Sequence, residues 1–352
     1  MSAEIKKTLA AAGVFVSMMV GAGFATGREL LTFFAASGLR GAVGFAVACA
    51  VLIICGWAVM DIAQRKKISG YRDFMGIILG KRLGGAMVAL VNVFIFVMLS
   101  TMLAGAGAAA QMTSPLPLPA GAFIMAALCF VVFLFDLRGI VSISTVLAPI
   151  LVIGGIFFGI HAALTATVPT FLTILTIRAE SISFLRPAVI YASYNLLTSV
   201  AVLCVLGAKI GSPRAARRAA FIAGGIIFAL GLSFLAPIYL NFPALQGIPV
   251  PLLAIAEHSG AALHIIYVLI LFAAILTTAV SCGFAVITYL TTIFPRRPLL
   301  IKAAVTLSAA ALSQLGFATF IDIAYPLFGY IGLFQIAAIL VYFLSARFQK
   351  LP

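Results

Sequence analysis

A glycine-rich segment followed by two charged residues interrupts the first apolar stretch of the chain. It reads VGAGFATGREL from Val20 to Leu30. Glycine adopts backbone geometries that are closed to other residues, and it leaves room for a ligand beside the main chain. If the stretch spans a membrane, such a break persists only where protein or a water-filled cavity covers it. We therefore expect a binding site here, and its members are Gly21, Ala22, Gly23, Ala25, Thr26 and Gly27.

Thr26 and Glu29 match the T-x-x-E capping box, which predicts that a second helix starts at Gly27. Free N–H groups at a helix start suit a carboxylate, and the carbonyl groups before the break suit an ammonium group. An amino acid carries both charged groups. The alternative is that the glycines only permit close packing of helices.

A second polar segment, IYASYNLLTS from Ile190 to Ser199, lies about 170 residues later, close to half the chain length. Polar groups this deep in an apolar span need partners. We expect it to be a second break whose polar groups face the first one. Hydrogen bonding between helices without a ligand is the alternative. The candidate residues are Tyr191, Ser193, Tyr194 and Asn195.

Composition indicates an all-α integral membrane protein. Of the 352 residues, 64% are hydrophobic and only 9% are charged, whereas about a quarter of the residues of a soluble domain are charged. Apolar runs near twenty residues recur along the chain, and no alternating strand pattern appears. We predict ten spans, at about 8–36, 42–62, 83–111, 119–135, 140–162, 182–207, 216–240, 262–294, 299–313 and 318–345.

The net charge is +14, and the distribution of the basic residues among the loops indicates the membrane topology. Most basic residues fall in alternate loops, such as QRKKISGYRDFMGIILGKR, KIGSPRAARR and the single Arg138, while the other loops carry almost no charge. The positive-inside rule makes the basic side cytoplasmic. Both termini are then cytoplasmic, we expect the cytoplasmic (inner) membrane of a bacterium, and a nucleic-acid partner is not expected.

The two interrupted spans predict an internal repeat. Five spans per half give halves of opposite orientation, 1–165 and 166–352, which together form one membrane domain. Paired interrupted helices in such halves are typical of transporters whose solute site lies at mid-membrane.

The segment GAGFATGRE, from Gly21 to Glu29, resembles the signature of the YkvI-type membrane proteins, which are related to the amino acid–polyamine–organocation superfamily of permeases. The resemblance implies the LeuT fold, with spans 1 and 6 unwound at mid-membrane. It also implies a small-solute site between a bundle (spans 1, 2, 6 and 7) and a scaffold (spans 3, 4, 8 and 9). An amino acid as substrate comes only from the wider superfamily.

Span 8 contains AAILTTAVS. In sodium-coupled members of the fold, an ion between spans 1 and 8 has ligands that resemble this pattern. Sodium prefers oxygen ligands, as other hard cations do. Threonines that only bond to their own helix are the alternative, with Ser281 as a further candidate ligand. The ligands implied by the resemblance are Ser17, Val20, Ala274, Thr277 and Thr278.

The charged residues after the break suggest a gate. The resemblance implies that Arg28 pairs with Asp322 on the tenth span and closes the outer side. Intramembrane charges are costly and are usually paired. Arg28 pairing with Glu29, or with nothing, remains open, and Glu29 is also a candidate proton site.

These features favour a sodium-coupled secondary transporter of an amino acid or related compound. A proton-coupled permease, a non-transporting sensor and a channel are the alternatives. We expect no enzymatic activity, no catalytic residues and no cofactor other than a possible Na⁺ ion, and the sequence does not predict the oligomeric state. The outer segment from Asn241 to Ala261 is either a linker or a lid.

Overall fold

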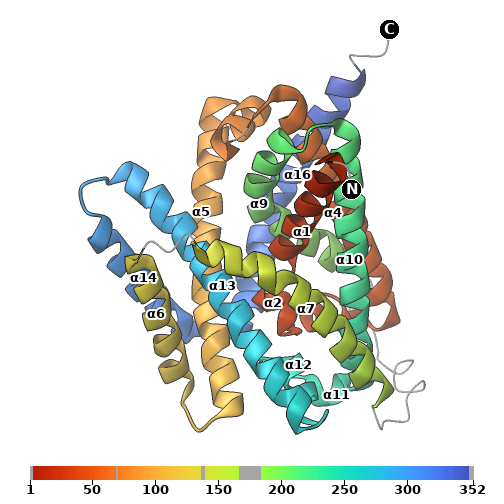
Figure 1. Ribbon diagram of the computed structural model, residues 1–352, viewed down its shortest axis with the longest axis vertical. Coiled ribbons are helices and arrows are strands. Elements are labelled where there is room, and N and C mark those ends of the chain that lie inside the picture. The colour runs from red at the N-terminus through yellow and green to blue at the C-terminus, as the bar shows by residue number, and fades with distance from the viewer. Residues whose placement is uncertain (1–2, 69, 136–138, 166–183, 349–352) are drawn as a thin grey trace.

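The computed structural model describes residues 3–68, 70–135, 139–165 and 184–348, which are helical and contain no strand (Figure 1). The predicted repeat boundary, at residues 165 and 166, falls where a described stretch ends, and Arg138 lies outside the described residues. The long helices between the first and the last span are α4 (Leu39–Lys66), α5 (Tyr71–Thr113), α6 (Leu118–Leu134), α7 (Gly139–Leu164), α9 (Leu185–Lys209), α10 (Pro213–Leu240), α13 (Ala261–Ile293) and α14 (Pro298–Leu312). Helix α5 kinks at Gly80, whose φ is 78°.

The first span is broken, as predicted. It consists of α1 (Ala3–Met19), α2 (Ala22–Ala25) and α3 (Arg28–Phe33). Gly27, which lies between α2 and α3, has a φ of 77°, in the left-handed region that favours glycine. This turn redirects the chain, so that α3 leaves the break in a new direction.

The capping-box prediction is wrong. Gly27 is the residue that precedes the first turn of α3, and as a glycine it supplies no side-chain cap. The hydroxyl of Thr26 instead donates to the Gly23 carbonyl oxygen at 2.7 Å, and it accepts from the Arg28 amide at 3.3 Å. The left-handed turn at Gly27 moves the helix start one residue beyond the position that a capping box at Thr26 requires.

The predicted break at Ile190–Ser199 is also wrong, because α9 is continuous through these residues. Two of its polar side chains bond to the backbone of their own helix without unwinding it. The side-chain amide of Asn195 donates to the Tyr191 carbonyl at 2.9 Å, and the hydroxyl of Ser199 donates to the Asn195 carbonyl at 2.6 Å. Such bonds to the preceding turn remove the cost of burying these groups.

The last span contains a feature that the sequence did not suggest. It begins with α15 (Phe317–Thr319), passes through a single π-helical turn, η3 (Phe320–Ala324), and continues as α16 (Tyr325–Phe348). Such π-turns often lie at functional sites. This turn contains Asp322, and Tyr325 follows it directly.

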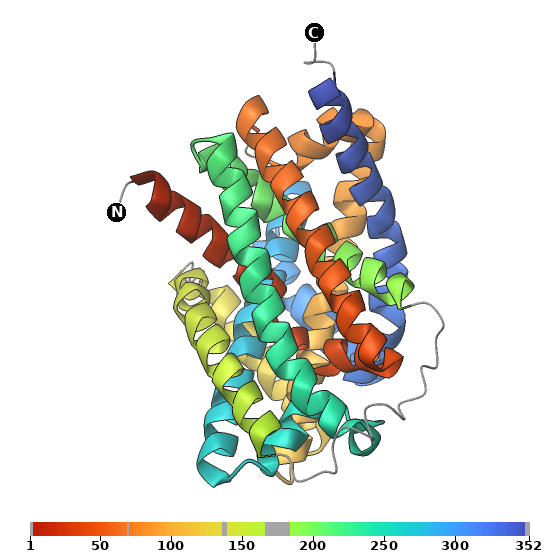
Figure 2. The same ribbon diagram turned by 90° about the vertical axis from the view of Figure 1, so that its right-hand side faces the viewer.

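The helices form the two groups that the resemblance implied. The bundle contains α1, α4, α9 and α10, in which α4 packs along α9 and α10, and α1 packs along α10 (Figure 2). The scaffold contains α5, α6, α13 and α14, with α5 along α13 and α6 (Figure 1). Helix α7 packs on α10 and α13, and α16 packs on α9. Within the described residues, the bundle and the scaffold therefore have four spans each, and α7 and α16 pack beside them.

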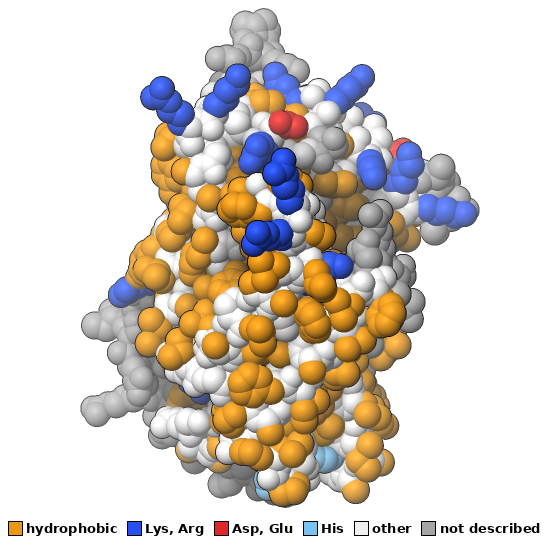
Figure 3. Space-filling model, turned by 90° about the vertical axis from the view of Figure 1, so that its left-hand side faces the viewer, with side chains coloured by type: hydrophobic (Ala, Val, Ile, Leu, Met, Phe, Trp, Pro, Cys, Tyr) orange, Lys and Arg blue, Asp and Glu red, His pale blue; other side chains and the backbone are white. Residues whose placement is uncertain are grey.

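The surface is that of a membrane protein. Seven helical segments of the described residues are long and apolar enough to cross a membrane. Large apolar side chains are exposed on their outer faces, such as Ile153, Leu269 and Val341, each about two-thirds exposed or more. Lysine and arginine side chains gather at the end of the molecule where both termini lie, above a broad hydrophobic band (Figure 3). Lipid therefore replaces water around the middle of the molecule.

Candidate functional site

The break in the first span lies against α13, as the predicted ion site requires. A side chain added at Gly21 would lie 3.7 Å from the Thr278 methyl group and 3.8 Å from its hydroxyl oxygen. The hydroxyl of Thr277 donates to the Ala273 and Ala274 carbonyls, at 3.0 and 3.1 Å. Thr278 is thus the predicted hydroxyl ligand that faces the break, while the donor of Thr277 is used within its own helix.

Two predicted carbonyl ligands lie on the inner side of the break. Helix α1 ends at Met19, and the amide of Val20 donates to the Val16 carbonyl at 2.8 Å. Ser17 and Val20 follow Val16, at the point where the regular pattern of helical hydrogen bonds stops. Their position agrees with a role as oxygen ligands, which stays a prediction.

Tyr267 of α13 also holds the break, and the sequence reading missed it. Its buried hydroxyl donates a short hydrogen bond to the Ala25 carbonyl. Helix α13 therefore contacts the break through both Thr278 and Tyr267. In the sequence, Tyr267 is a single tyrosine within an apolar run, and this pattern alone does not indicate a binding site.

On the opposite side of the break, Glu29 points inward. Its side chain is only 6% exposed, and its carboxylate fills the space that a side chain at Gly23 would take. Within the described residues, no lysine, arginine or histidine forms a salt bridge with Glu29. A buried carboxylate without a positive partner is costly, so this position points to a function.

Three buried tyrosines surround this carboxylate, and we call Tyr191, Tyr194 and Tyr325 the tyrosine cluster. Their hydroxyls lie within electrostatic reach of Glu29, and Tyr194 lies beside its carboxyl group. None of the three hydroxyls completes a well-formed hydrogen bond within the described part of the chain. Tyr191 and Tyr194 were predicted site residues, whereas Tyr325 was missed because its helix was considered only for the gate.

Phenylalanine rings complete the enclosure. Phe33 of α3 lies 5.8 Å from Tyr191 and 5.5 Å from Tyr194 between ring centroids. Phe94 of α5 lies 5.5 Å from Tyr325, and the Tyr194 and Tyr325 rings are 4.9 Å apart. Side chains of α3, α5, α9 and α16 therefore enclose the Glu29 carboxylate in aromatic surface.

Two other predicted residues of α9 make different contacts. The hydroxyl of Ser193 donates to the Gly329 carbonyl of α16 at 2.5 Å, and the Asn195 amide donates within α9. Both hydroxyl and amide donors are thus engaged in structural bonds, in line with the alternative left open for this segment. The structure brings Tyr191 and Tyr194 to the break, and it engages Ser193 and Asn195 elsewhere.

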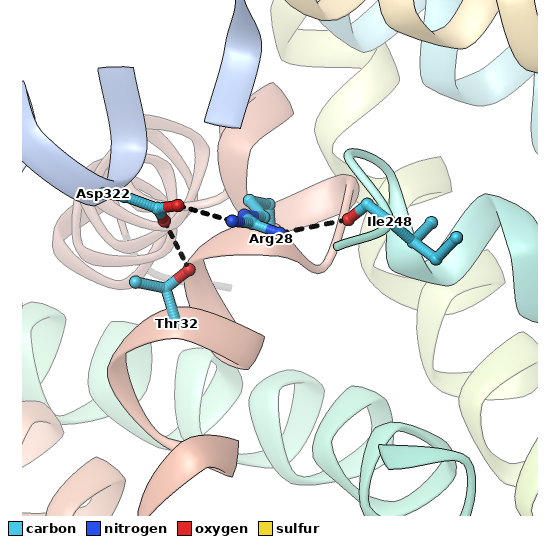
Figure 4. A network of polar contacts seen from close by, with 4 residues as sticks. All are labelled: Arg28, Thr32, Ile248 and Asp322. Atoms are coloured by element: carbon cyan, nitrogen blue, oxygen red, sulfur yellow. Dashed lines mark hydrogen bonds and ion pairs between the residues drawn. The ribbon is translucent and has the colours of Figure 1, made fainter. Parts of the chain in front are cut away.

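The Arg28 side chain meets the last span and the segment that contains Ile248 (Figure 4). Its Nη2 lies 2.5 Å from Oδ2 of Asp322, and its Nη1 donates to the Ile248 carbonyl at 3.1 Å. Thr32, one turn further on, donates to the other carboxylate oxygen of Asp322 at 3.0 Å. The guanidinium therefore makes single contacts with two partners and does not form a two-bond pair with Asp322.

The outer segment from residue 241 to 260 contacts the break directly. It contains α11 (Phe242–Leu245) and α12 (Pro251–Glu257). The amide of Leu252 donates to the Thr26 carbonyl at 3.1 Å, and its side chain packs against Gly27. The segment covers the outer end of the first span and contributes the Ile248 carbonyl to Arg28.

Comparison with known proteins extends these observations. No family model matches the chain. The sequence is 28% identical over 332 residues to the uncharacterized membrane protein YkvI of Bacillus subtilis (strain 168), covering 93% of each chain. It is 25% identical over 338 residues to the uncharacterized protein YyaD of the same organism, covering 96% of this chain and 97% of that one.

Solved structures share the architecture at low sequence identity. MhsT in complex with L-phenylalanine gives a TM-score of 0.66 at 16% identity, over 96% of this chain and 88% of that one. Mhp1 in its inward-facing conformation gives 0.63 at 14%, over 92% and 73%. A manganese transporter of Eremococcus coleocola gives 0.61 at 14%, over 95% and 78%. The chain has the LeuT fold. In LeuT-fold terms, the broken first span lies in the bundle, and Thr278 and Tyr267 belong to the scaffold.

Proposed function

We propose that this protein is a secondary active transporter of a small solute, working by alternating access between bundle and scaffold. One observation carries the proposal: a broken first span is enclosed by other helices, with an ion-ligand candidate on one side and a buried carboxylate on the other. Broken helices at a repeat interface are where transporters of this kind hold their cargo.

The solute in this proposal is an amino acid or a related compound that carries an amino group. The superfamily resemblance and the bound L-phenylalanine of MhsT support an amine-bearing solute. Sodium enters as the coupling ion, with Thr278, Ser17 and Val20 as oxygen ligands beside the break, together with Ala274 and Thr277. No enzymatic step and no further cofactor belong to the proposal.

A proton-coupled permease is the second candidate, and one observation favours it. Glu29 is buried without a cationic side chain beside it in the described residues, so a proton is a possible charge partner. The proposed location is the bacterial cytoplasmic membrane, with both termini inside, which the basic end of the molecule supports (Figure 3).

Reconstitution tests the proposal. We expect purified protein in proteoliposomes to accumulate a labelled amine-bearing solute when a sodium gradient is imposed, and to lose this activity when the gradient is collapsed. Accumulation driven by a proton gradient alone would transfer the coupling role to Glu29. Flux that only equilibrates the solute indicates a channel, and binding without flux indicates a sensor.

A further inference from the structure

We infer that the solute is an organic cation, a protonated amine without a free carboxylate, held by the Glu29 carboxylate within the aromatic enclosure. This inference names the solute class for the proposed site and rests on the proposed function for its role in transport. It begins from Glu29, the buried acidic residue that lies beside the break.

The acidic group that faces the break is the Glu29 carboxylate. Glu29 is 6% exposed, and Arg28 is committed to Asp322 and Ile248 on the other face of α3. A buried carboxylate stays ionised at low cost only beside a positive partner. Among the described residues no cationic side chain pairs with it, and a positively charged solute would supply such a partner.

The surroundings suit an organic cation better than a metal ion. The rings of Phe33, Phe94 and the tyrosine cluster pack against one another, with neighbouring centroids 4.9–6.2 Å apart, and Tyr194 lies beside the carboxylate. Aromatic faces attract an ammonium group and also accept its hydrocarbon body. A sodium ion needs several oxygen ligands, which these faces do not provide.

The same geometry disfavours a free carboxylate on the solute. Helix α3 has only six residues, and Glu29 lies in its first turn. A solute carboxylate at the break would therefore lie close to an ionised side chain of the same sign. Like charges at close range are strongly unfavourable where water is scarce.

The hydroxyls of the tyrosine cluster give the enclosure its polar contacts. All three are buried, and none completes a well-formed hydrogen bond with a described residue. Buried hydroxyls are normally paired. An ammonium group held between Glu29 and these rings has up to three N–H donors, which satisfy Glu29 together with the nearest hydroxyls.

The solute reaches this position only when α3 moves. The rings are in contact, and Phe33 and Glu29 lie four residues apart on one face of α3. Arg28 and Thr32 lie on another face and are held by Asp322. Release of Asp322 therefore frees the helix that carries both Glu29 and one wall of the enclosure.

Two sets of probes test the inference, and within each set the molecules share one hydrocarbon group and differ in their charged groups. We would measure the thermal stability of the detergent-solubilised full chain with isobutylamine, L-valine and isovalerate, and with 2-phenylethylamine, L-phenylalanine and 3-phenylpropionate. We expect the two amines to stabilise the protein and the two carboxylates not to do so. The zwitterions should bind at least about tenfold more weakly than the amines, as the loss of a charged contact implies.

The variants separate Glu29 from general effects. Glu29→Gln should weaken amine binding about tenfold or more, while Glu257→Gln, the same change at an exposed position on α12, should leave it unchanged. Sodium-dependent stabilisation should persist in Glu29→Gln and thus report a folded protein. Tyr194→Phe should bind more weakly than the wild-type protein but more tightly than Glu29→Gln, because it retains the ring.

Two results would overturn the inference: preferential stabilisation by the zwitterions or carboxylates, or unchanged amine binding in Glu29→Gln. Failure of the proposed function has a different signature. Absence of amine flux into proteoliposomes, with amine binding that depends on Glu29, would leave the cation site in place and remove the transporter role. Flux of L-valine without amine binding would support the transporter role and rule out the cation site.

Discussion

At the scale of single residues, two positions around the break carry the chemistry. Gly23 has no side chain, and the Glu29 carboxylate occupies the space beside it. Gly21 lies beside Thr278, so that the other side of the break faces a hydroxyl of α13. Gly21 and Gly23 are two residues apart, which is about half a helical turn. One therefore faces the Thr278 hydroxyl and the other faces the Glu29 carboxylate.

Gly23→Leu should abolish solute binding while leaving the protein folded. The new side chain overlaps the end of the Glu29 side chain, which is flexible enough to move, so the carboxylate is displaced and the backbone is not. Solute-induced thermal stabilisation measures the effect. Gly13→Ala is the control, because nothing lies within 4 Å of a side chain added there. Wild-type affinity in Gly23→Leu would rule out a solute beside this backbone.

Sodium should stabilise the wild-type protein, and Thr277→Ala with Thr278→Ala should remove the effect. An ion that binds only the folded state adds about 2.7 kcal/mol at a hundredfold excess over its Kd. We expect Thr278→Ala alone to account for most of the loss, because Thr278 faces Gly21. Melting in sodium chloride against potassium chloride at equal ionic strength measures it.

The control for the sodium site is Thr292→Ala on the same helix. That hydroxyl is exposed and donates to the Tyr289 carbonyl, far from the break in sequence. Its removal should leave the sodium-dependent shift intact. Equal shifts by sodium and by potassium in the wild-type protein would contradict the site.

At the scale of elements, small residues let α16 approach α9. A side chain added at Gly332 would lie 2.6 Å from the Ser193 hydroxyl and 2.7 Å from the Ser193 carbonyl oxygen. Ser193 also donates to the Gly329 carbonyl. This contact positions Tyr325 at the start of α16 against Tyr194 of α9, so helix packing builds part of the enclosure.

Gly332→Ala should lower the stability of the protein by about 1–3 kcal/mol, as overpacking of a close contact does. Backbone atoms of α9 block the new methyl group and do not move as readily as the end of a side chain. The midpoint of thermal unfolding in detergent measures the change. Gly225→Ala on α10 should be neutral or slightly stabilising, since nothing lies within 4 Å of the added carbon. Equal midpoints in the two variants would show that α9 and α16 tolerate separation.

At the scale of the whole molecule, contacts between distant segments cover the end of the first span that follows the break. Arg28 connects the first span to Asp322, 294 residues away, and to Ile248 in the outer segment. Leu252 adds a backbone bond to Thr26. The side chains of Arg28 and Asp322 are 11% and 38% exposed, so water reaches the pair and each contact is modest. We therefore expect that loss of one contact weakens this closure by a modest amount.

Asp322→Asn and Arg28→Gln should each raise the outward-open population. A partly exposed ion pair contributes up to about 1 kcal/mol, which corresponds to roughly a fivefold change in population. The readout is the labelling rate of a cysteine replacing Leu252, which is buried against Gly27, in a background without the five native cysteines.

The double variant should label no faster than the faster single variant, because both changes break one interaction. Arg40→Gln, at an exposed position, should not change the rate. Strictly additive effects of Arg28→Gln and Asp322→Asn would show that the two residues act independently and would end their role as a common gate.

Composition and local pattern determined the class of the protein, the ten spans and the break at Gly21–Gly27. These properties depend on hydrophobicity and on the backbone freedom of glycine, which act over short stretches of sequence. The continuity of α9 depended on where its polar side chains found partners, because Asn195 and Ser199 bond to their own helix and need no break.

Only the tertiary structure decided that Glu29 faces the tyrosine cluster while Arg28 faces Asp322. The left-handed turn at Gly27 sets the phase of α3, and the π-turn before Tyr325 sets that of α16. Sequence spacing alone does not predict which way side chains point after such turns, since each turn rotates every residue that follows it.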